Sequence, residues 1–386
     1  MIPVDVLKPA REFPIETSLR LAIRTLVATV FLSVLAACGR APDLVGIDNA
    51  QKPVAEQKEA QLRKVFIATT REASEVVGVF YSAERAPELG LASVVVSIPP
   101  THVVGQLERP KNLPPDPETE FAVIEPAVYR SENSFVSSIN AELAKLPPNK
   151  RKILLFVHGY NNTTSDSILR MAQFVEDTGF DGVPILFAWA SAAKASHYVY
   201  DLNSALIARP QLLETGRILK RTNATGADLF AHSMGSFLTV EAIVQAQLAG
   251  NFNATKQIEN VMLAAPDIDL NLFQTQLSYL RKQDRNFTIF ASTDDKALGF
   301  SKRISGGVQR VGAADASQLE PLGVTVIDLS KIDDSSSGSH SKFAGSPEIV
   351  QLLGKSLKSD NFRSGQKQST LVEILDGVPV LSVLTD

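Results

Sequence analysis

The stretch Ala231-His232-Ser233-Met234-Gly235 constrains the fold of this chain most, because it joins a strand to a helix through one sharp turn. Residues 226–230 form a short apolar run typical of a buried strand, and residues 236–244 carry apolar side chains at helical spacing. Small residues two positions before and after Ser233 allow such a turn to close. The pattern predicts an exposed serine hydroxyl above a parallel sheet; the alternative is that Ser233 only caps a helix.

Strands and helices alternate along most of the remaining chain. Strands are expected at 65–69, 92–98, 152–157, 183–189, 260–265, 287–292 and 324–329, and helices at 134–146, 165–177, 202–220 and 272–282. This alternation predicts an α/β fold with a doubly wound, mostly parallel sheet and helices on both faces. We expect this domain to span residues 61–356, followed by a C-terminal tail or an added element at 357–386.

The composition excludes several function classes. An apolar share of 44% and a charged share of 21% are typical of a globular protein. A net charge of −4 provides no electrostatic reason to expect binding to nucleic acid. The sequence contains no phosphate-binding loop, dinucleotide fingerprint or His-Glu-x-x-His motif, and we expect neither a cofactor nor a metal.

The one cysteine, Cys38, ends a pattern typical of an export signal. Arg20 and Arg24 precede an apolar run at 26–34, which is shorter than the ~20 residues that span a membrane. Leu35-Ala36-Ala37-Cys38 then resembles the lipobox of bacterial lipoproteins. The pattern predicts a membrane anchor made by lipidation of Cys38; an uncleaved signal is the alternative.

This interpretation divides the N-terminal region and predicts a location. Residues 1–37 would be a lipoprotein signal peptide, and the polar segment 38–60 a tether. We expect the protein in the bacterial cell envelope, with the outer membrane favoured because Gly39 is not aspartate. The domain itself then contains no thiol, which excludes a cysteine nucleophile and cysteine-based zinc sites.

A serine becomes a strong nucleophile only beside a base, which near neutral pH is usually histidine. Where the serine stands on a strand-to-helix turn, the acid and then the histidine follow it in the chain. Of the five histidines, His102, His158 and His197 lie well before Ser233, and the adjacent His232 is expected to project away from it. His340, in a polar loop after the strand at 324–329, is the candidate that is left.

The acid should lie in the loop after a late strand, where it can orient the imidazole. Asp294 and Asp295 follow the strand at 287–292, and we favour Asp295 because the first residues after a strand usually make the turn. Asp294 and Asp267 are the alternatives. A further alternative is that Asp294 or Asp295 only caps the next helix.

Two backbone N–H groups should stabilise the oxyanion that forms when a serine attacks a carbonyl. We expect one from Met234, at the start of the helix after the turn, and the other from Tyr160, because Gly159 lets the backbone turn inward. Trp189 ends the strand at 183–189 and is expected either to line a pocket or to pack in the core.

These motifs resemble an uncharacterised family of bacterial α/β-hydrolases, often labelled esterase or lipase-like, over about residues 63–350. The resemblance rests on the segments 66–71, 156–162, 187–189, 231–235, 295–298 and the His340 loop. It implies the α/β-hydrolase fold and the triad Ser233, Asp295 and His340, but no defined substrate. The chain departs from the family at Trp189-Ala190-Ser191, where Trp-Pro-Ser is common, and at 338–341, where Gly-Ser-His-Ser replaces Gly-His-Ser-Tyr.

The leading hypothesis is a lipid-anchored serine hydrolase that cleaves small-molecule or lipid carboxylic esters through an acyl-enzyme. A peptidase, amidase or thioesterase with the same residues is one alternative. A non-catalytic binding or assembly lipoprotein of the cell envelope is another, because a fold does not prove a function. The oligomeric state is not predicted.

Overall fold

The structure is a computed structural model that describes residues 40–250, 252–254, 256–332, 339–358 and 380–381. The expected signal peptide and Cys38 lie outside the described residues. Contacts divide the chain into Met1–Ala41 and Pro42–Asp386, and the second unit is described below. Within the described ranges, no helix has both the length and the apolar character to cross a membrane.

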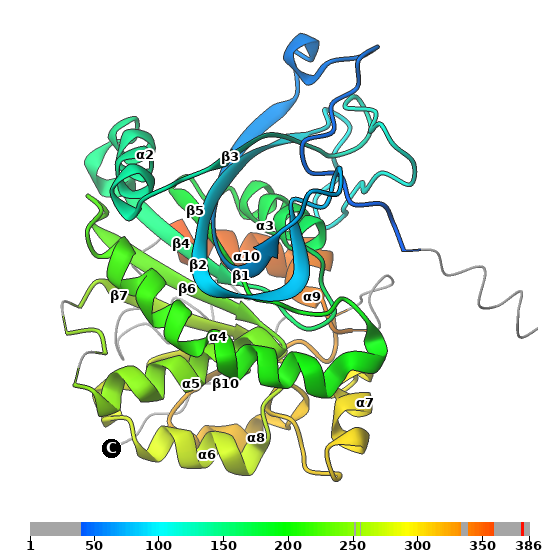
Figure 1. Cartoon of the computed structure of the whole chain (residues 1–386). Coiled ribbons are helices and arrows are strands. Elements are labelled where there is room, and N and C mark those ends of the chain that lie inside the picture. Colours follow the sequence, from blue (N-terminus) through cyan, green and yellow to red (C-terminus); the bar gives the residue numbers. More distant parts are fainter. Residues whose placement is uncertain (1–39, 251, 255, 333–338, 359–379, 382–386) are drawn as a thin grey trace, which may run out of the picture. The chain divides into compact units, whose positions relative to one another are not determined.

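Ten strands in the described residues form one sheet in the order β10-β9-β8-β7-β6-β4-β5-β1-β2-β3 (Figure 1). The strands are β1 (Gln61–Ala73), β2 (Tyr81–Ile98), β3 (Ala122–Val128), β4 (Lys152–Val157), β5 (Val183–Ala188), β6 (Gly226–His232), β7 (Ile258–Ala264), β8 (Phe287–Ala291), β9 (Thr325–Asp328) and β10 (Val380–Leu381). In this sheet order, all neighbouring strands from β9 to β1 pair in parallel. Strand β10 at one edge and strands β2 and β3 at the other pair antiparallel. The predicted mostly parallel sheet is confirmed.

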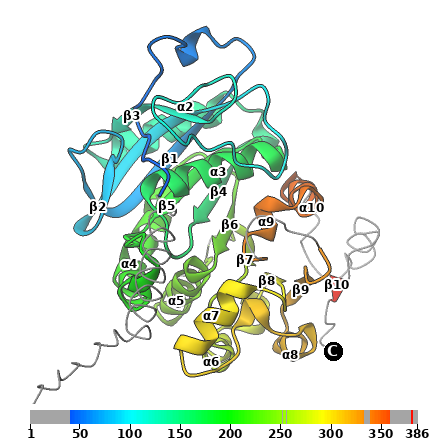
Figure 2. The same ribbon diagram turned by 90° about the vertical axis from the view of Figure 1, so that its right-hand side faces the viewer.

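Helices cover both faces of this sheet (Figure 2). They are α2 (Glu132–Ala144), α3 (Thr164–Thr178), α4 (Tyr198–Leu219), α5 (Met234–Leu248), α6 (Leu270–Ser278), α7 (Lys296–Ile304), α8 (Ala316–Leu319), α9 (Lys342–Gly345) and α10 (Pro347–Lys358). Buried side chains of α3, α9 and α10 pack on one face, and those of α2, α4, α5, α6 and α8 on the other.

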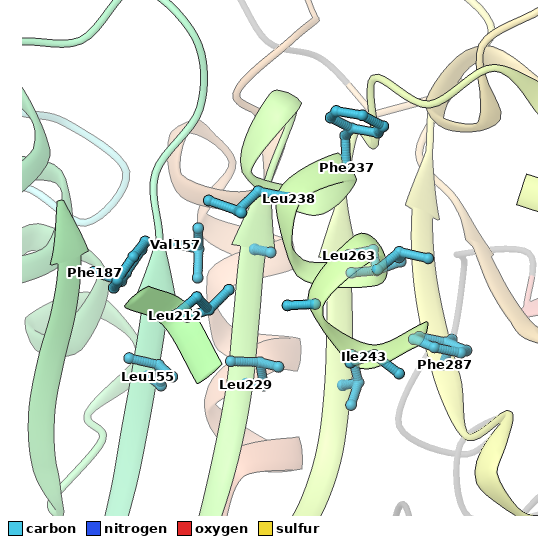
Figure 3. Close-up of a cluster of buried hydrophobic side chains, with 14 of the residues drawn as sticks. Leu155, Val157, Phe187, Leu212, Leu229, Phe237, Leu238, Ile243, Leu263 and Phe287 are labelled. Carbon is cyan, nitrogen blue, oxygen red and sulfur yellow. The ribbon is translucent and has the colours of Figure 1, made fainter. Parts of the chain in front are cut away.

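Strand β4 shows why its sequence is apolar at nearly every position. Leu154 and Phe156 belong to the core under α3, whereas Leu155 and Val157 belong to the core under α4 and α5. Figure 3 shows the second core, in which Leu155 and Val157 lie near Leu229 of β6. Each such side chain removed from water contributes about 1.5–3 kcal/mol, so both faces favour this strand.

The first part of the sheet differs from the prediction. The strand expected at 65–69 is the middle of the longer strand β1, and the strand expected at 92–98 is the last part of the longer strand β2. Strand β3 was not expected. The first part of β2, residues 81–90, is largely polar and mostly only partly buried, so its sequence carries no apolar strand pattern. This part is a strand because it pairs antiparallel with β1. The helix expected at 272–282 ends at Ser278.

The structure adds detail at the two ends of the expected domain. Within the segment expected to be a tether, Leu44 and Val45 are buried, and the Val45 N–H donates to the Gly78 carbonyl. Apolar side chains within a polar segment can thus be covered by a neighbouring sheet. At the other end, α10 continues past residue 356, and β10 pairs antiparallel with β9. Residues 359–379 and 382–386 of the expected tail lie outside the described residues.

The order in which strands are added to the sheet reverses between β4 and β6, which are neighbours: β5 lies beside β4 on one side, and β7 lies beside β6 on the other. After β4 the chain enters α3 on one face, and after β6 it enters α5 on the other. In open α/β sheets a crevice forms at the carboxyl ends of the strands at such a point. The loops after β4 and β6 meet there, and they carry Tyr160 and Ser233.

Candidate active site

Ser233 lies on the predicted turn between β6 and α5, and this local structure is confirmed. Its backbone has φ 54° and ψ −124°, a strained conformation for a residue with a side chain. The Ser233 N–H donates to the Ala264 carbonyl at 2.9 Å, and the Asp267 N–H donates to the Ser233 carbonyl at 3.2 Å. A side chain at Gly235 would place Cβ 2.3 Å from the His158 carbonyl oxygen, so only glycine fits there.

The exposure of Ser233 differs from the prediction. The residue is only 3% exposed, although the hydroxyl was expected to stand open above the sheet. The physical reason is the loop after β4, whose Gly159 approaches so closely that an added Cβ would lie 2.9 Å from the Ser233 Cβ.

His340 and Asp295 are in direct contact. The His340 Nδ1 lies 2.8 Å from Asp295 Oδ2, and the Asp295 side chain is fully buried. The other oxygen, Oδ1, accepts from the Leu298 N–H at the start of α7, so Asp295 both caps a helix and holds the imidazole. Among the described contacts, the Ser233 hydroxyl forms no hydrogen bond with the His340 ring; such bonds often tighten only when substrate binds.

The two alternative acids face other partners. Asp294 accepts hydrogen bonds from Lys342 and Ser339. Asp267 accepts from the Tyr198 hydroxyl at 2.9 Å and from the Ser301 hydroxyl at 2.6 Å. The structure therefore brings Asp295, and neither alternative, to the His340 ring.

His232 has a role that sequence reasoning missed. Its ring lies 4.8 Å from the His340 ring, and its Nε2 lies 3.1 Å from the His340 carbonyl oxygen. Burial and the nearby His340 hold the pKa of His232 well below its ordinary value, so the ring is neutral and Nε2 can donate. His232 thus supports the backbone of the His340 loop. Its position next to Ser233 in the chain is the only signal in the sequence.

The loop after β4 brings Tyr160 to the same end of the sheet as the first turn of α5. Met234 is the first residue of α5, where backbone N–H groups have no partner within their own helix. Tyr160 directly follows Gly159, which touches the Ser233 turn as described above. This placement agrees with the expected oxyanion donors without testing their role.

Two buried charged side chains hold this loop in place. The Arg71 guanidinium, 2% exposed, donates to the carbonyls of Asn162 at 2.7 Å and Ser191 at 3.1 Å. The Asp201 carboxylate accepts from the N–H groups of Asn161 at 3.2 Å and Ala192 at 2.7 Å. Arg71 ends one of the segments on which the family resemblance rests, and its contacts explain a buried arginine there.

The family model of the alpha/beta hydrolases of unknown function (DUF900) matches residues 131–356, the part of the chain that contains Ser233, Asp295 and His340. The chain belongs to this family. The predicted α/β-hydrolase fold is confirmed. None of the curated proteins compared with the chain matches it.

Several solved structures are similar to it at low identity. An esterase of Rhizomucor miehei is 11% identical over 79% of this chain and 85% of that one, with a TM-score of 0.35. A predicted CIB-like hydrolase of Thermoplasma acidophilum is 12% identical over 78% and 99%, with a TM-score of 0.34. An esterase of Pyrobaculum calidifontis is 9% identical over 79% and 87%, with a TM-score of 0.33.

Trp189 lies in the core beside the site. It is fully buried, its ring stacks on the His158 ring at 5.1 Å, and its Nε1–H donates to the His158 carbonyl at 2.7 Å. Burial, followed by the charge of Arg71, lowers the pKa of His158 to about 3. These residues support the strand ends beneath the site, and Trp189 packs in the core.

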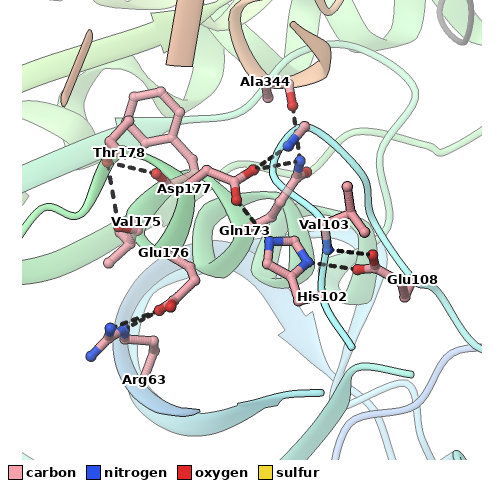
Figure 4. A network of polar contacts seen from close by, with 12 residues as sticks. Arg63, His102, Val103, Glu108, Gln173, Val175, Glu176, Asp177, Thr178 and Ala344 are labelled. Atoms are coloured by element: carbon pink, nitrogen blue, oxygen red, sulfur yellow. Dashed lines mark hydrogen bonds and ion pairs between the residues drawn. The ribbon is translucent and has the colours of Figure 1, made fainter. Parts of the chain in front are cut away.

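A second polar network lies around His102 (Figure 4). The two ring nitrogens of His102 lie 2.7 Å from Glu108 and 2.7 Å from Asp177. Burial would lower the pKa of His102, but the hydrogen bonds with both carboxylates outweigh it and raise the pKa to about 9. Gln173 links Asp177 to the Ala344 carbonyl of α9, so this network ties α3 to the helix that follows His340.

No group of three or more histidine, cysteine, aspartate or glutamate side chains with the arrangement of a metal site occurs in the described part of the chain.

Proposed function

We propose that this protein is a serine hydrolase that cleaves carboxylic esters through an acyl-enzyme. The observation that carries the proposal is the 2.8 Å contact between His340 and Asp295, next to a strained turn that presents Ser233. A serine, a histidine and a buried carboxylate in chain order are the parts that this reaction needs. Membership in a hydrolase family supports the reaction class.

In the proposed reaction, Ser233 Oγ attacks the carbonyl carbon of the ester while His340 Nε2 accepts the hydroxyl proton. Asp295 accepts the Nδ1–H of His340 and stabilises the imidazolium that forms. The N–H groups of Tyr160 and Met234 bind the oxyanion. The alcohol leaves with the proton from His340, and water, activated by the same imidazole, then releases the carboxylic acid and restores Ser233.

Labelling of the full chain with a fluorophosphonate, which reacts with activated serines, tests this proposal. Mass spectrometry should place the adduct on Ser233. We expect Ser233→Ala to remove it and His340→Ala to slow labelling by about 10²–10⁴-fold, because the general base is lost. His197→Ala, at an exposed histidine, is the matched control and should label like the wild type. Labelling that is unaffected in the His340 variant, or absent from the folded wild type, contradicts the proposal.

The choice of ester over amide or thioester needs its own measurement. Substrates that share one acyl group but differ in the leaving atom separate these reactions. We expect the ester to give the highest kcat/KM and Ser233→Ala to abolish its turnover. Faster cleavage of the amide or thioester would replace the substrate class while leaving the role of Ser233 intact.

We also propose that the protein is exported to the bacterial cell envelope and anchored by a lipid on Cys38. The support is the sequence pattern of Arg20 and Arg24, the apolar run and the Leu-Ala-Ala-Cys motif. Metabolic labelling with an alkyne fatty acid should mark the wild type and Ser233→Ala but not Cys38→Ala. Equal labelling of the cysteine variant contradicts the anchor.

A further inference from the structure

Lys342 is a buried cation that the proposed reaction does not use. It lies two residues after His340 at the start of α9, and its side chain is only 1% exposed. An ammonium group leaves water only where other groups replace its hydration. The contacts of Lys342 therefore show which groups replace the water around its ammonium group.

All three donor directions of the Lys342 ammonium are used. Its Nζ lies 2.9 Å from the Ser292 hydroxyl, 2.8 Å from the Leu329 carbonyl oxygen and 2.9 Å from Asp294 Oδ1. Ser292 directly follows β8, and Leu329 directly follows β9. Lys342 thus ties the segment that carries His340 to the carboxyl ends of two adjacent strands.

Asp294 holds the same segment from the other side of His340. Its Oδ2 accepts from the Ser339 hydroxyl at 2.8 Å, while Oδ1 faces Lys342. Burial would raise the pKa of Asp294, but hydrogen bonds from Ser292, Lys342 and Ser339 hold it below its ordinary value, so the carboxylate is charged. Two consecutive carboxylates therefore have different roles: Asp295 contacts the His340 ring, and Asp294 contacts the Ser339 and Lys342 side chains on either side of His340.

We propose that the Asp294–Lys342 ion pair is a positioning device that sets where the His340 ring lies relative to Ser233. The proposal rests on the proposed role of His340 as the base. A single hydrogen bond to Asp295 lets the ring swing about that bond, whereas anchoring at Ser339 and Lys342 fixes the segment that carries it. A misplacement of about 1 Å at a reacting group can lower a rate by about 10²-fold.

The test compares Lys342→Met with Lys152→Met in the full chain. Lys152 also forms a largely buried ion pair, 2.9 Å from Glu259, but it begins β4 at the opposite end of that strand from the site. We expect Lys342→Met to lower kcat about 10–10²-fold with KM within about twofold, and Lys152→Met to leave kcat unchanged. Equal kcat values in the two variants overturn the proposal.

Asp294→Asn gives a second variant in case Lys342→Met does not fold. The Asp294 side chain is 48% exposed, so an isosteric amide is tolerated, and it weakens both anchoring contacts. We expect a kcat loss in the same direction. In the double variant Asp294→Asn/Lys342→Met the losses should not add, because the two residues act as one unit. Additive losses overturn the proposal.

A spectroscopic readout separates this proposal from the proposed function. The Nδ1–H proton shared by His340 and Asp295 should give a low-field proton resonance that Asp295→Asn removes. We expect Lys342→Met to shift or broaden this resonance and Lys152→Met to preserve it, whether or not the protein hydrolyses esters. An unchanged resonance in Lys342→Met overturns the positioning role, whereas ester turnover that persists in Ser233→Ala overturns the proposed function alone.

Discussion

Replacing Gly159 by alanine tests whether the close approach of two loops builds the site. A Cβ at this position would lie 2.8 Å from His232 Nδ1 and 2.9 Å from Ser233 Cβ. Carbon atoms in contact rest about 3.5–4.0 Å apart, so the two loops must separate by about 0.6 Å or more. The His232 ring cannot retreat freely, because it packs on His340 and Phe343 at ring distances of 4.8 and 4.7 Å.

Two effects of this separation are expected. Separation of the loops moves the Tyr160 N–H away from the position of the oxyanion, and we expect kcat to fall about 10–10²-fold. Overpacking of this kind costs about 1–3 kcal/mol of unfolding free energy. For a chain of roughly 300 folded residues this lowers Tm by about 2–5 °C.

Steady-state ester hydrolysis and thermal unfolding of Gly159→Ala measure both effects. Gly216→Ala is the control, because a Cβ at Gly216, inside α4, meets nothing within 4 Å. That variant should keep its kcat and gain up to about 1 kcal/mol from its better helix propensity. A wild-type kcat in Gly159→Ala would refute the reasoning, since the loop after β4 would then have room for a side chain that the structure does not show.

Three further predictions concern the proposed acid, the buried arginine and His102. Asp295→Asn should lower kcat by about 10⁴-fold, because an amide no longer fixes the His340 tautomer, whereas Asp267→Asn should cost far less; steady-state kinetics compare them. Arg71→Lys should lower the unfolding free energy by about 2–4 kcal/mol, measured by chemical denaturation, because an ammonium cannot reach all of its carbonyl partners. The raised pKa of His102 predicts stability that is complete below pH 6.5 and is lost, by about 3 kcal/mol, as the pH rises through about 9; thermal unfolding across this range measures it, and His102→Gln should flatten the curve.

Each of these has a result that contradicts it. Equal kcat losses in the two aspartate variants would remove the distinction between Asp295 and Asp267. Wild-type stability in Arg71→Lys would mean that the loop after β4 does not depend on the guanidinium. A pH slope that persists in His102→Gln would assign that slope to another group.

Local patterns in the sequence were enough to predict the parallel part of the sheet and the Ser233 turn. A continuous apolar run such as 152–157 is buried whichever helix covers it. The small-x-Ser-x-Gly turn depends only on residues that are adjacent in the sequence. The antiparallel strands were harder to predict from the sequence. Strand β3 is exposed over most of its length and contains Pro126, and the first part of β2 (residues 81–90) is largely polar, so only pairing with a neighbouring strand makes these segments strands.

Elimination among five histidines led to His340, but the acid remained a choice among three aspartates until the tertiary structure placed one of them. Asp294 and Asp295 are adjacent in the chain, and their side chains take different partners because one faces Lys342 and the other faces His340. His340 lies 45 residues further along, on the loop of the next strand. Which of the two aspartates faces the His340 ring depends on how the ends of β8 and β9 align. That alignment is a property of the packed sheet.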